Sequence, residues 1–436
     1  MNLSQFTAFR VKNYKYIQNA FLPKITTIPL SQEKDCICNP IVKVGDIVNE
    51  GDVIAEPELK AKDKALIHSS VPGKVVNIIS SLCPNGRIEK SIQIQFGGKF
   101  TYTGKKIDKE NVEHSSENTI ISTLIKKGIV NTFDIEKPVS LGEQIKKTDK
   151  NTKNLVVRLF DEDKSRLTDI LVSKFYSEQI VEGAKVIAKV INAEKIILVG
   201  KKTSQVVEKF RKWECESICI KKIDPNSVPT MLKRGLILSC NKLKKSDSTK
   251  ICKGDFFIDS STLYEVYYSI YEHIPSVSRN VHFSGNCLKA SCFLNVRIGQ
   301  TLSDVINQIG GFSKYPSKII INGESYGNVV SSLDVPITKY VKSVSFLSAE
   351  KKLDSISYSC VSCSCCRTVC PVGLSPDLLY NFMVNNLKIS EVYKKSSLLC
   401  TECGLCNSNC KSRLPLSQTI AVLKKQTEKL GSKDEK

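Results

Sequence analysis

Two runs of cysteine near the C-terminus constrain this chain more than any other feature. Both runs have the spacing C-x2-C-x2-C-x3-C, which comprises Cys360, Cys363, Cys366, Cys370, Cys400, Cys403, Cys406 and Cys410. Three closely spaced thiolates from one loop can hold three corners of an iron–sulfur cube, and the fourth must come from farther away. The spacing therefore predicts two [4Fe–4S] clusters, which carry one electron at a time.

The ligands of the two clusters are expected to cross between the runs. In two-cluster ferredoxins, the fourth cysteine of each run binds the other cluster. This pattern assigns Cys360, Cys363, Cys366 and Cys410 to one cluster, and Cys400, Cys403, Cys406 and Cys370 to the other. Zinc is the alternative metal, but its sites usually pair two C-x2–4-C knuckles. A disulfide framework is typical of small secreted chains, and this chain is long and lacks a signal-peptide pattern.

Composition indicates a globular protein of about three domains, with 436 residues and a formal charge of +20. Because lysine is spread along the whole chain, we do not expect nucleic-acid binding. The charge indicates either an ordinary solvated surface or a basic face that steers an acidic redox partner, such as a ferredoxin or flavodoxin. No apolar run reaches the roughly 18 residues that span a bilayer. We expect a cytoplasmic location, alone or peripheral to the cytoplasmic membrane through a complex.

The N-terminal third predicts a small β domain. Gly45-Asp46 and Gly51-Asp52 interrupt short β-branched runs, as turns between strands do. The pattern "VKVGDIVNEGDVIAE … IHSSVPGKVVNI" resembles a barrel-sandwich domain of the biotinyl/lipoyl type. The sequence context of a biotinylated lysine is absent, so Lys60, Lys62 and Lys64 are interpreted as surface residues.

The middle of the chain predicts a parallel α/β sheet. A buried strand is expected at 155–159 and another at 195–199, ended by Gly200. The helix between them has Ile180, Ala184, Ile187 and Ile191 on one face. Strand–helix–strand order favours parallel pairing. Further strands are expected at 217–223 and 235–240.

Two further modules follow. Residues 281–347 predict two strands, a turn at Gly299, a helix capped by Thr301 or Ser303 and a third strand, which resembles the β-grasp fold called SLBB. Between the cysteine runs, Ser375 and Pro376 are expected to begin a helix whose apolar face carries Leu378, Leu379, Phe382, Met383 and Leu387. A last helix is expected from Leu416 to Gly431.

The order of these modules resembles RnfC, the peripheral subunit of the Rnf electron-transport complex, and its relatives PduS and PrdC. The motifs that carry the resemblance are "CNPIVKVGDIVNEGDVIAEP", "IHSSVPGKVV", "LDVPITK", "CVSCSCCRTVCPVGLSPDLLY" and "CTECGLCNSNCKSRLPLSQ". It implies an α+β multidomain fold. The expected domains are a barrel-sandwich hybrid (1–100), an RnfC-like, Rossmann-like α/β domain (101–275), an SLBB β-grasp domain (276–350) and a helical dicluster ferredoxin-like domain (351–436).

The chain departs from the family where RnfC binds NADH and flavin. Residues 128–138 stand where the family has a glycine-rich loop, and only Gly128-Ile129-Val130 matches its beginning. Glycines there let backbone N–H groups approach phosphate oxygens. Residues 160–163 and 223–228 replace two further family segments. These three departures predict that FMN and NADH binding has been lost.

Other residues carry weaker signals. Lys411 follows Cys410 where the family has proline, and a lysine beside a cluster would raise its reduction potential. Cys365 is interpreted as a packed thiol, with a spare ligand as the alternative, and Cys36 and Cys38 form a C-x-C pair. The pairs Cys215 and Cys219, Cys240 and Cys252, and Cys287 and Cys292 are interpreted as buried small residues. The four histidines form no ligand pair, so we expect no catalytic residues.

These observations predict an iron–sulfur electron-transfer protein. It would relay electrons between a reduced carrier and a partner reductase, as PrdC-like proteins do, without NADH dehydrogenase activity of its own. The alternatives are an RnfC subunit of an ion-translocating ferredoxin:NAD oxidoreductase complex with NADH and FMN, and a cluster-bearing scaffold without catalytic function. The expected partners are ferredoxin, flavodoxin or a reductase subunit.

Overall fold

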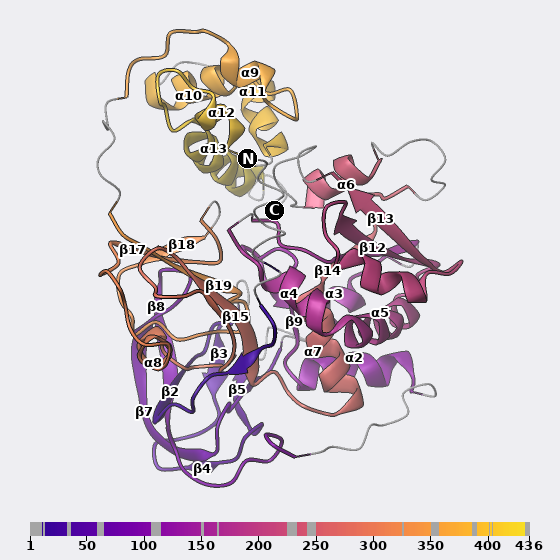
Figure 1. Cartoon of the computed structure of the whole chain (residues 1–436), viewed down its shortest axis with the longest axis vertical. Coiled ribbons are helices and arrows are strands. Elements are labelled where there is room, and N and C mark those ends of the chain that lie inside the picture. The colour runs from indigo at the N-terminus through magenta and orange to yellow at the C-terminus, as the bar shows by residue number, and fades with distance from the viewer. Residues whose placement is uncertain are drawn as a thin grey trace. The chain divides into compact units, whose positions relative to one another are not determined.

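In a computed structural model, the chain forms two compact units (Figure 1). The structure describes residues 11, 14–32, 36–58, 65–105, 115–149, 152–163, 165–224, 233–241, 250–324, 327–349, 357–385, 390–400, 402 and 404–431, with the backbone alone for 428–431. Unit 1 comprises Met1–Asp224 and Leu243–Ala349, and unit 2 comprises Pro225–Lys242 and Glu350–Lys436. No described helix is long and apolar enough to cross a membrane.

The N-terminal part of unit 1 is a sandwich of two small sheets, with strand orders β2-β8-β7-β4 and β3-β5-β6. The strands are β2 (Ile25–Pro29), β3 (Cys38–Pro40), β4 (Ile47–Val48), β5 (Val53–Pro57), β6 (Ile67–His68), β7 (Gly73–Leu82) and β8 (Ile88–Phe96). Both predicted Gly–Asp turns are confirmed. Gly45 and Gly51 have positive φ, and the Asp46 and Asp52 carboxylates accept backbone N–H bonds within these turns. Lys60, Lys62 and Lys64 lie outside the described residues.

The predicted parallel sheet is confirmed, with strand order β13-β12-β11-β14. Its strands are β11 (Asn154–Arg158), β12 (Lys195–Lys201), β13 (Ile218–Ile223) and β14 (Phe256–Asp259). It packs with α5 (Ser177–Val190), α7 (Ser260–Tyr271) and the 3-10 helix η1 (Val207–Trp213), and α4 (Thr168–Phe175) packs with α5 and α7. On α5, the predicted face of Ile180, Ala184 and Ile187 is fully buried.

Two details of the predicted α/β part are wrong. Strand β12 continues through Gly200, which pairs with Lys222. A Cβ on Gly200 would lie 2.0 Å from Val207 Cγ2, so the glycine permits close packing of η1 and does not end the strand. Residues 235–240 are helical, within α6 (Lys233–Asn241), which buries Leu236, Ser239 and Cys240 at helical spacing. A short apolar run does not distinguish a buried strand from a helix.

Within the described residues, four short elements precede this sheet in sequence. They are α2 (Glu117–Lys126), β9 (Val130–Asn131), β10 (Val139–Ser140) and α3 (Leu141–Lys146). Ser116 caps α2 by accepting a bond from the Thr119 N–H, which satisfies one of the unpaired donors of the first turn. Strands β9 and β10 pair as a small antiparallel hairpin within residues 128–140.

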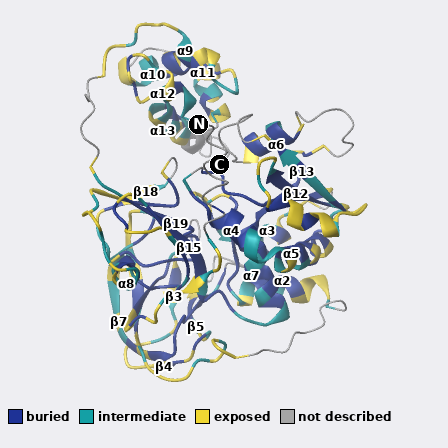
Figure 2. Ribbon diagram, viewed as in Figure 1, coloured by how far each residue is buried: buried dark blue, intermediate teal, exposed yellow. Residues whose placement is uncertain are grey.

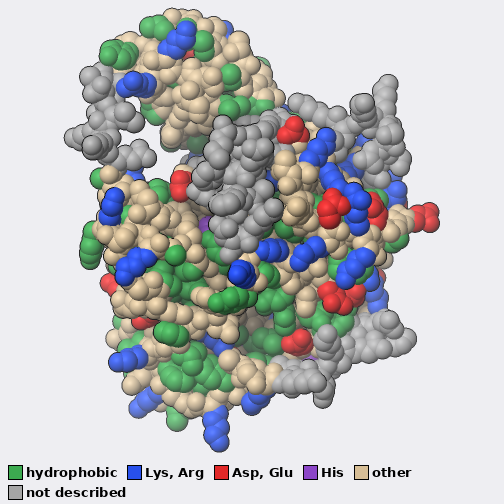
Figure 3. Space-filling view, viewed as in Figure 1, with side chains coloured by type: hydrophobic (Ala, Val, Ile, Leu, Met, Phe, Trp, Pro, Cys, Tyr) green, Lys and Arg blue, Asp and Glu red, His purple; other side chains and the backbone are tan. Residues whose placement is uncertain are grey.

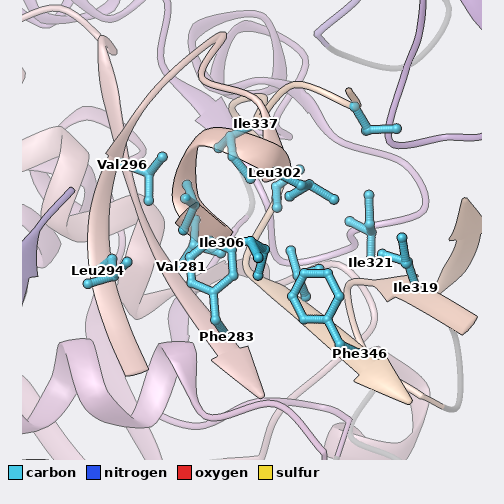
Figure 4. Packing of buried hydrophobic residues seen from close by; sticks show 14 of the residues in the cluster. Val281, Phe283, Leu294, Val296, Leu302, Ile306, Ile319, Ile321, Ile337 and Phe346 are labelled. Atoms are coloured by element: carbon cyan, nitrogen blue, oxygen red, sulfur yellow. The ribbon is translucent and has the colours of Figure 1, made fainter. Parts of the chain in front are cut away.

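A mixed six-stranded sheet with order β1-β16-β15-β19-β17-β18 completes unit 1. The strands are β1 (Gln18–Asn19), β15 (Ser278–Ser284), β16 (Cys292–Arg297), β17 (Lys318–Ile321), β18 (Asn328–Val330) and β19 (Ser343–Leu347). The predicted helix is α8 (Leu302–Gln308), capped by Thr301, whose hydroxyl accepts from the Asp304 N–H. Figure 4 shows Leu302 and Ile306 of α8 against Phe283 and Phe346 of the sheet. The strands β15 and β19 are dark blue in Figure 2 because nearly all their residues are buried.

Besides α6, the described part of unit 2 contains α9 (Cys365–Thr368), α10 (Pro376–Asn385), α11 (Glu391–Ser396), the 3-10 helix η2 (Ser397–Leu399), α12 (Leu405–Ser408) and α13 (Leu416–Gly431). The predicted starts of α10 and α13 are confirmed. Leu379 of α10 packs with Ile420 and Leu423 of α13, all fully buried. Leu378 was predicted on the apolar face but is 40% exposed, and Leu387 lies outside the described residues.

Positive charge is dispersed on the visible faces of both units. In Figure 3, lysine and arginine side chains are scattered among hydrophobic and acidic ones. This distribution resembles an ordinary solvated surface over most of the visible face.

Candidate iron–sulfur sites

The two cysteine runs fold into the same structure twice. Each run curls through a loop into one short helix, α9 or α12, and then turns into a long helix, α10 or α13. Left-handed backbone occurs at matching positions forty residues apart, which are Ser362 and Glu402, Ser364 and Gly404, and Gly373 and Arg413. Side chains other than glycine seldom adopt this conformation, so its repetition reflects a shared loop geometry.

A first cavity, here called site A, lies against cysteines from both runs. Its space of about 290 Å³, partly open to solvent, is lined by Cys360, Cys363 and Cys366 of the first run and Cys410 of the second. A second cavity, site B, likewise partly open to solvent with a space of about 320 Å³, is lined by Cys400 and Cys406 of the second run and Cys370 of the first. Cys403 lies outside the described residues. The described cysteines therefore divide between the cavities in the crossed pattern that the spacing predicts.

The donor set around both cavities suits a sulfur-ligated cluster. Backbone N–H groups point at three cysteine sulfurs: Leu374 N lies 3.2 Å from Cys370 Sγ, Leu414 N lies 3.4 Å from Cys410 Sγ, and Glu402 N lies 3.4 Å from Cys400 Sγ. Such bonds stabilise thiolate charge and tune cluster potentials. The first two bonds are equivalent in the repeat. Among the described residues, no three Cys, His, Asp or Glu side chains form a group of the kind that holds a single metal ion.

Charged groups surround the two cavities differently. At site A, the Asp377 carboxylate lies 3.7 Å from Cys366 Sγ and forms a two-pronged ion pair with Arg367, at 2.8 and 2.6 Å. The hydrogen bonds from Arg367 lower the pKa of Asp377, so this carboxylate stays ionised. The matching positions at site B are neutral, with the Ser417 N–H donating to Asn407 Oδ1 at 2.7 Å.

Lysines lie near both cavities. Hydrogen bonds involving Cys365, and then the positive charge of Lys411, lower the pKa of the exposed Cys363 thiol. Near site B, Lys424 Nζ donates to the Cys400 carbonyl at 3.1 Å and pairs with Glu402 at 2.7 Å. Lys411 therefore lies near a ligand of site A, whereas the Lys424 charge is balanced by a carboxylate.

The remaining cysteines divide between packed and exposed positions. Cys365 is half-buried beside Cys363, and Cys36 and Cys38 are buried with their sulfurs 4.0 Å apart. The interpretation of six others as buried residues is confirmed for Cys240 and Cys287 and wrong for Cys215 and Cys252, which are exposed, while Cys219 and Cys292 are half-buried. Spacing alone contains no information about burial at such isolated positions.

The segment that departs from the family's nucleotide loop uses its backbone donors internally. Ile129 N–H donates to Leu124 O, Thr132 N–H to Thr262 Oγ1 and Phe133 N–H to Asn131 Oδ1, at 3.0, 3.1 and 3.0 Å. N–H groups that cradle a phosphate must instead point at it. These residues therefore do not fit the phosphate-binding role of a glycine-rich loop.

A buried ionic network joins this segment to the residues that replace the family's second segment. Arg158 donates to Phe133 O at 3.0 Å, stacks on the Phe133 ring and pairs with Glu162 at 2.7 Å. Arg166 pairs with Glu162 and with Asp161. Burial raises the pKa of Glu162, but the charges of Arg158 and Arg166 outweigh it and bring the pKa to about 2. Asp161, Glu162 and Arg166 are therefore bonded to one another, and Arg158 connects Glu162 to the loop.

The network continues to the mixed sheet. Lys342 Nζ pairs with Asp169 at 2.7 Å and with Asp259 at 2.9 Å, and all three side chains are fully buried. Asp259 also accepts from Thr132 Oγ1 at 2.9 Å. This network was not predicted, because its members are far apart in the chain and no local spacing connects them. A cationic residue within a predicted apolar strand region, such as Arg158, is the one signal that points to it.

Comparison with known proteins supports the resemblance. Residues 8–99 match the family model of the RnfC barrel sandwich hybrid domain. A subunit of the proton-translocating ferredoxin:NAD(+) oxidoreductase complex of Clostridium ljungdahlii is 26% identical over 84% of this chain and 80% of its own length. The chain is RnfC-like. A subunit of the Na(+)-translocating ferredoxin:NAD(+) oxidoreductase complex of Acetobacterium woodii is 24% identical over 84% of this RnfC-like chain and 82% of its own length.

Two further similarities are more distant. A subunit of the ion-translocating oxidoreductase complex of Rhodobacter capsulatus is 24% identical over 83% of the RnfC-like chain and 70% of its own length. A chain in the crystal structure of an air-oxidised NAD+-reducing [NiFe]-hydrogenase aligns with a TM-score of 0.46 and 12% identity over 73% of this chain and 68% of its own. That structural likeness is too small to assign a function.

Proposed function

We propose that this chain is the electron-transfer subunit of an Rnf-type oxidoreductase complex and carries two [4Fe–4S] clusters. The observation that carries the proposal is the crossed division of the described cysteines between sites A and B. Cys360, Cys363, Cys366 and Cys410 would hold one cluster, and Cys400, Cys403, Cys406 and Cys370 the other. The relatives are named as subunits of ion-translocating oxidoreductase complexes, which favours this assignment over the PrdC-like one.

The clusters would supply one-electron redox chemistry, and the protein would hold and tune them. The N–H groups of Leu374 and Leu414 stabilise the charge on the fourth ligand of each run. Leu414 and Leu416 pack against Cys366 and Cys406, which keeps water from part of each site. Sharing each fourth ligand between runs ties the two sites into one small core, so an electron can pass between them without leaving unit 2.

The finer domain assignment belongs to the same proposal. Residues 276–350 would form an SLBB domain, supported by the mixed sheet with α8 against it, and 351–436 a dicluster ferredoxin-like domain. The barrel-sandwich (1–100) and SLBB modules would dock other subunits, and the α/β part (101–275) would serve as scaffold. Association with a membrane would be peripheral, through the complex.

Electrons would reach this chain from a protein carrier, without bound FMN or NADH. The loop N–H groups of Ile129, Thr132 and Phe133 are bonded within the protein. Arg158 pairs with Glu162 and donates to the Phe133 carbonyl of the loop, so a flavin phosphate would have to break a buried ion pair. The competing candidate is an NADH-oxidising flavoprotein, which the names of the ferredoxin:NAD(+) oxidoreductase relatives favour.

Anaerobic purification with iron, zinc and flavin analysis tests the proposal, followed by additions of NADH and then dithionite. The proposal predicts iron without flavin, no bleaching by NADH and reversible bleaching by dithionite. Bound flavin with bleaching by NADH would favour the competing candidate. Clusters that dithionite does not reduce reversibly would favour a scaffold role.

A further inference from the structure

We propose that the surface at the mouth of site A, made by Tyr358, Val361, Lys411 and Arg413, docks a small acidic one-electron carrier protein. This inference rests on the proposed function, because it assumes that site A holds a cluster. It adds the place of contact, the chemistry of the partner and the cluster that exchanges electrons with it.

Backbone contact brings the two halves of this surface together. Tyr358 N–H donates to Ser412 O at 3.1 Å, so the segment before the first cysteine run lies beside the turn after the second. Tyr358 and Val361 are large apolar side chains that are 60% and 65% exposed. Transient redox interfaces are small, with an apolar centre and a charged rim. Tyr358 and Val361 would form that centre.

A ligand of site A reaches solvent at the same place. Val361 and Cys363 both line the cavity, and Cys363 is exposed. Electron transfer requires close approach of two redox centres, so a carrier docked over Val361 would approach the cluster through the nearest ligand sulfur. Among the described cysteines of site B, Cys370 and Cys400 are half-buried and Cys406 is buried, and Cys403, the counterpart of Cys363, lies outside the described residues.

The charges select an acidic partner. Residues 357–363 and 410–414 contain two cationic side chains, Lys411 and Arg413, and no carboxylate, and both cations are exposed. Exposed charges at the rim of an interface steer encounter with a partner of opposite charge and make association dependent on salt.

The test measures binding rather than electron transfer. The full chain, purified anaerobically with its iron content determined, is titrated with an oxidised two-[4Fe–4S] ferredoxin of strongly negative net charge. The variant Lys411→Glu/Arg413→Glu is compared with Lys202→Glu/Lys212→Glu, which reverses two exposed lysines of the α/β part and changes net charge equally. We expect the first variant to bind roughly tenfold more weakly and the control to stay within about twofold of the unchanged protein.

Two further comparisons distinguish docking at this surface from nonspecific attraction between opposite charges. Tyr358→Ala should weaken binding at high salt, where the apolar contact remains, and basic cytochrome c should not bind. Equal weakening by both charge-reversal pairs, binding insensitive to salt, or equal binding of cytochrome c would overturn the inference. Normal iron content without ferredoxin binding would refute the docking surface and leave the proposed function standing, whereas absent iron would refute the proposed function itself.

Discussion

Lys342→Met tests whether the buried ionic network is a structural core of unit 1. Lys342 Nζ lies within 3 Å of the Asp169 and Asp259 carboxylates, and none of these side chains is exposed. Methionine fills much of the same volume but leaves two buried carboxylates facing each other, with Arg158 3.9 Å from Asp169. Removing one partner of a buried pair costs about 3–5 kcal/mol of unfolding free energy. That is a large fraction of the roughly 5–15 kcal/mol that stabilises a typical domain.

The loss should depend on pH in a defined direction. Burial raises the pKa of Asp169 to about 6 even with Lys342 present, and removal of the lysine raises it further. A carboxyl whose pKa is higher in the folded state than in the unfolded state destabilises the fold when it is ionised. Protonation relieves that cost, so the deficit of the variant should be smaller at about pH 5.5 than at about pH 8.

Trp213 provides the assay, because it is the single tryptophan of the chain and lies on η1 in unit 1. Urea unfolding followed by its fluorescence reports on unit 1, while sites A and B belong to unit 2. The control Lys185→Met breaks an exposed pair with Glu182 and should cost about 0.5 kcal/mol or less. A Lys342→Met loss below about 1 kcal/mol, well under the range for a broken buried pair, or one that grows as pH falls, would refute the structural role of the network.

Three further predictions concern single side chains. Burial lowers the pKa of His68 to about 3, below its unfolded value of 6.5, so the free energy of unfolding should fall as pH drops below about 6.5, by about 2 kcal/mol at pH 5. Urea titrations of His68→Gln should show a weaker dependence of the unfolding free energy on pH in this range. An unchanged pH dependence would contradict the assignment. Cys366→Ser should lose about four irons per chain, whereas Cys365→Ser should keep the iron content of the unchanged protein. Iron analysis of the two variants tests this, and an equal loss in both would make Cys365 a ligand. Asp377→Asn removes a negative charge 3.7 Å from Cys366 Sγ and should raise the reduction potential of one of the two clusters by on the order of 50 mV. A redox titration in which neither potential shifts, or both shift equally, would exclude a local effect.

Local signals predicted much of unit 2. Ser375 and Pro376 are residues that favour a helix start, and α10 begins at Pro376. The three-residue steps between cysteines indicate that the sulfurs of one run lie close together, whereas their assignment as cluster ligands follows the two-cluster ferredoxin pattern and stays a prediction. The pairing of Arg367 with Asp377 was not predicted, since a ten-residue separation across a loop leaves many alternatives open.

Features that depend on long-range contacts could not be predicted. Asp169, Asp259 and Lys342 come from three elements, and only the folded backbone brings them together. The six residues 235–240 were interpreted as a strand because the run is apolar and short, yet burial of Leu236 with Ser239 and Cys240 follows a helix. Such runs are settled by tertiary contacts, which outweigh local preference.

Quantification of iron, sulfide and zinc in anaerobically purified protein tests the central claim most directly. The account predicts about eight irons and eight sulfides per chain without zinc, and, after reduction, an EPR spectrum of two interacting [4Fe–4S] centres. Stoichiometric zinc in place of iron, or a single uncoupled cluster with about four irons, would contradict it.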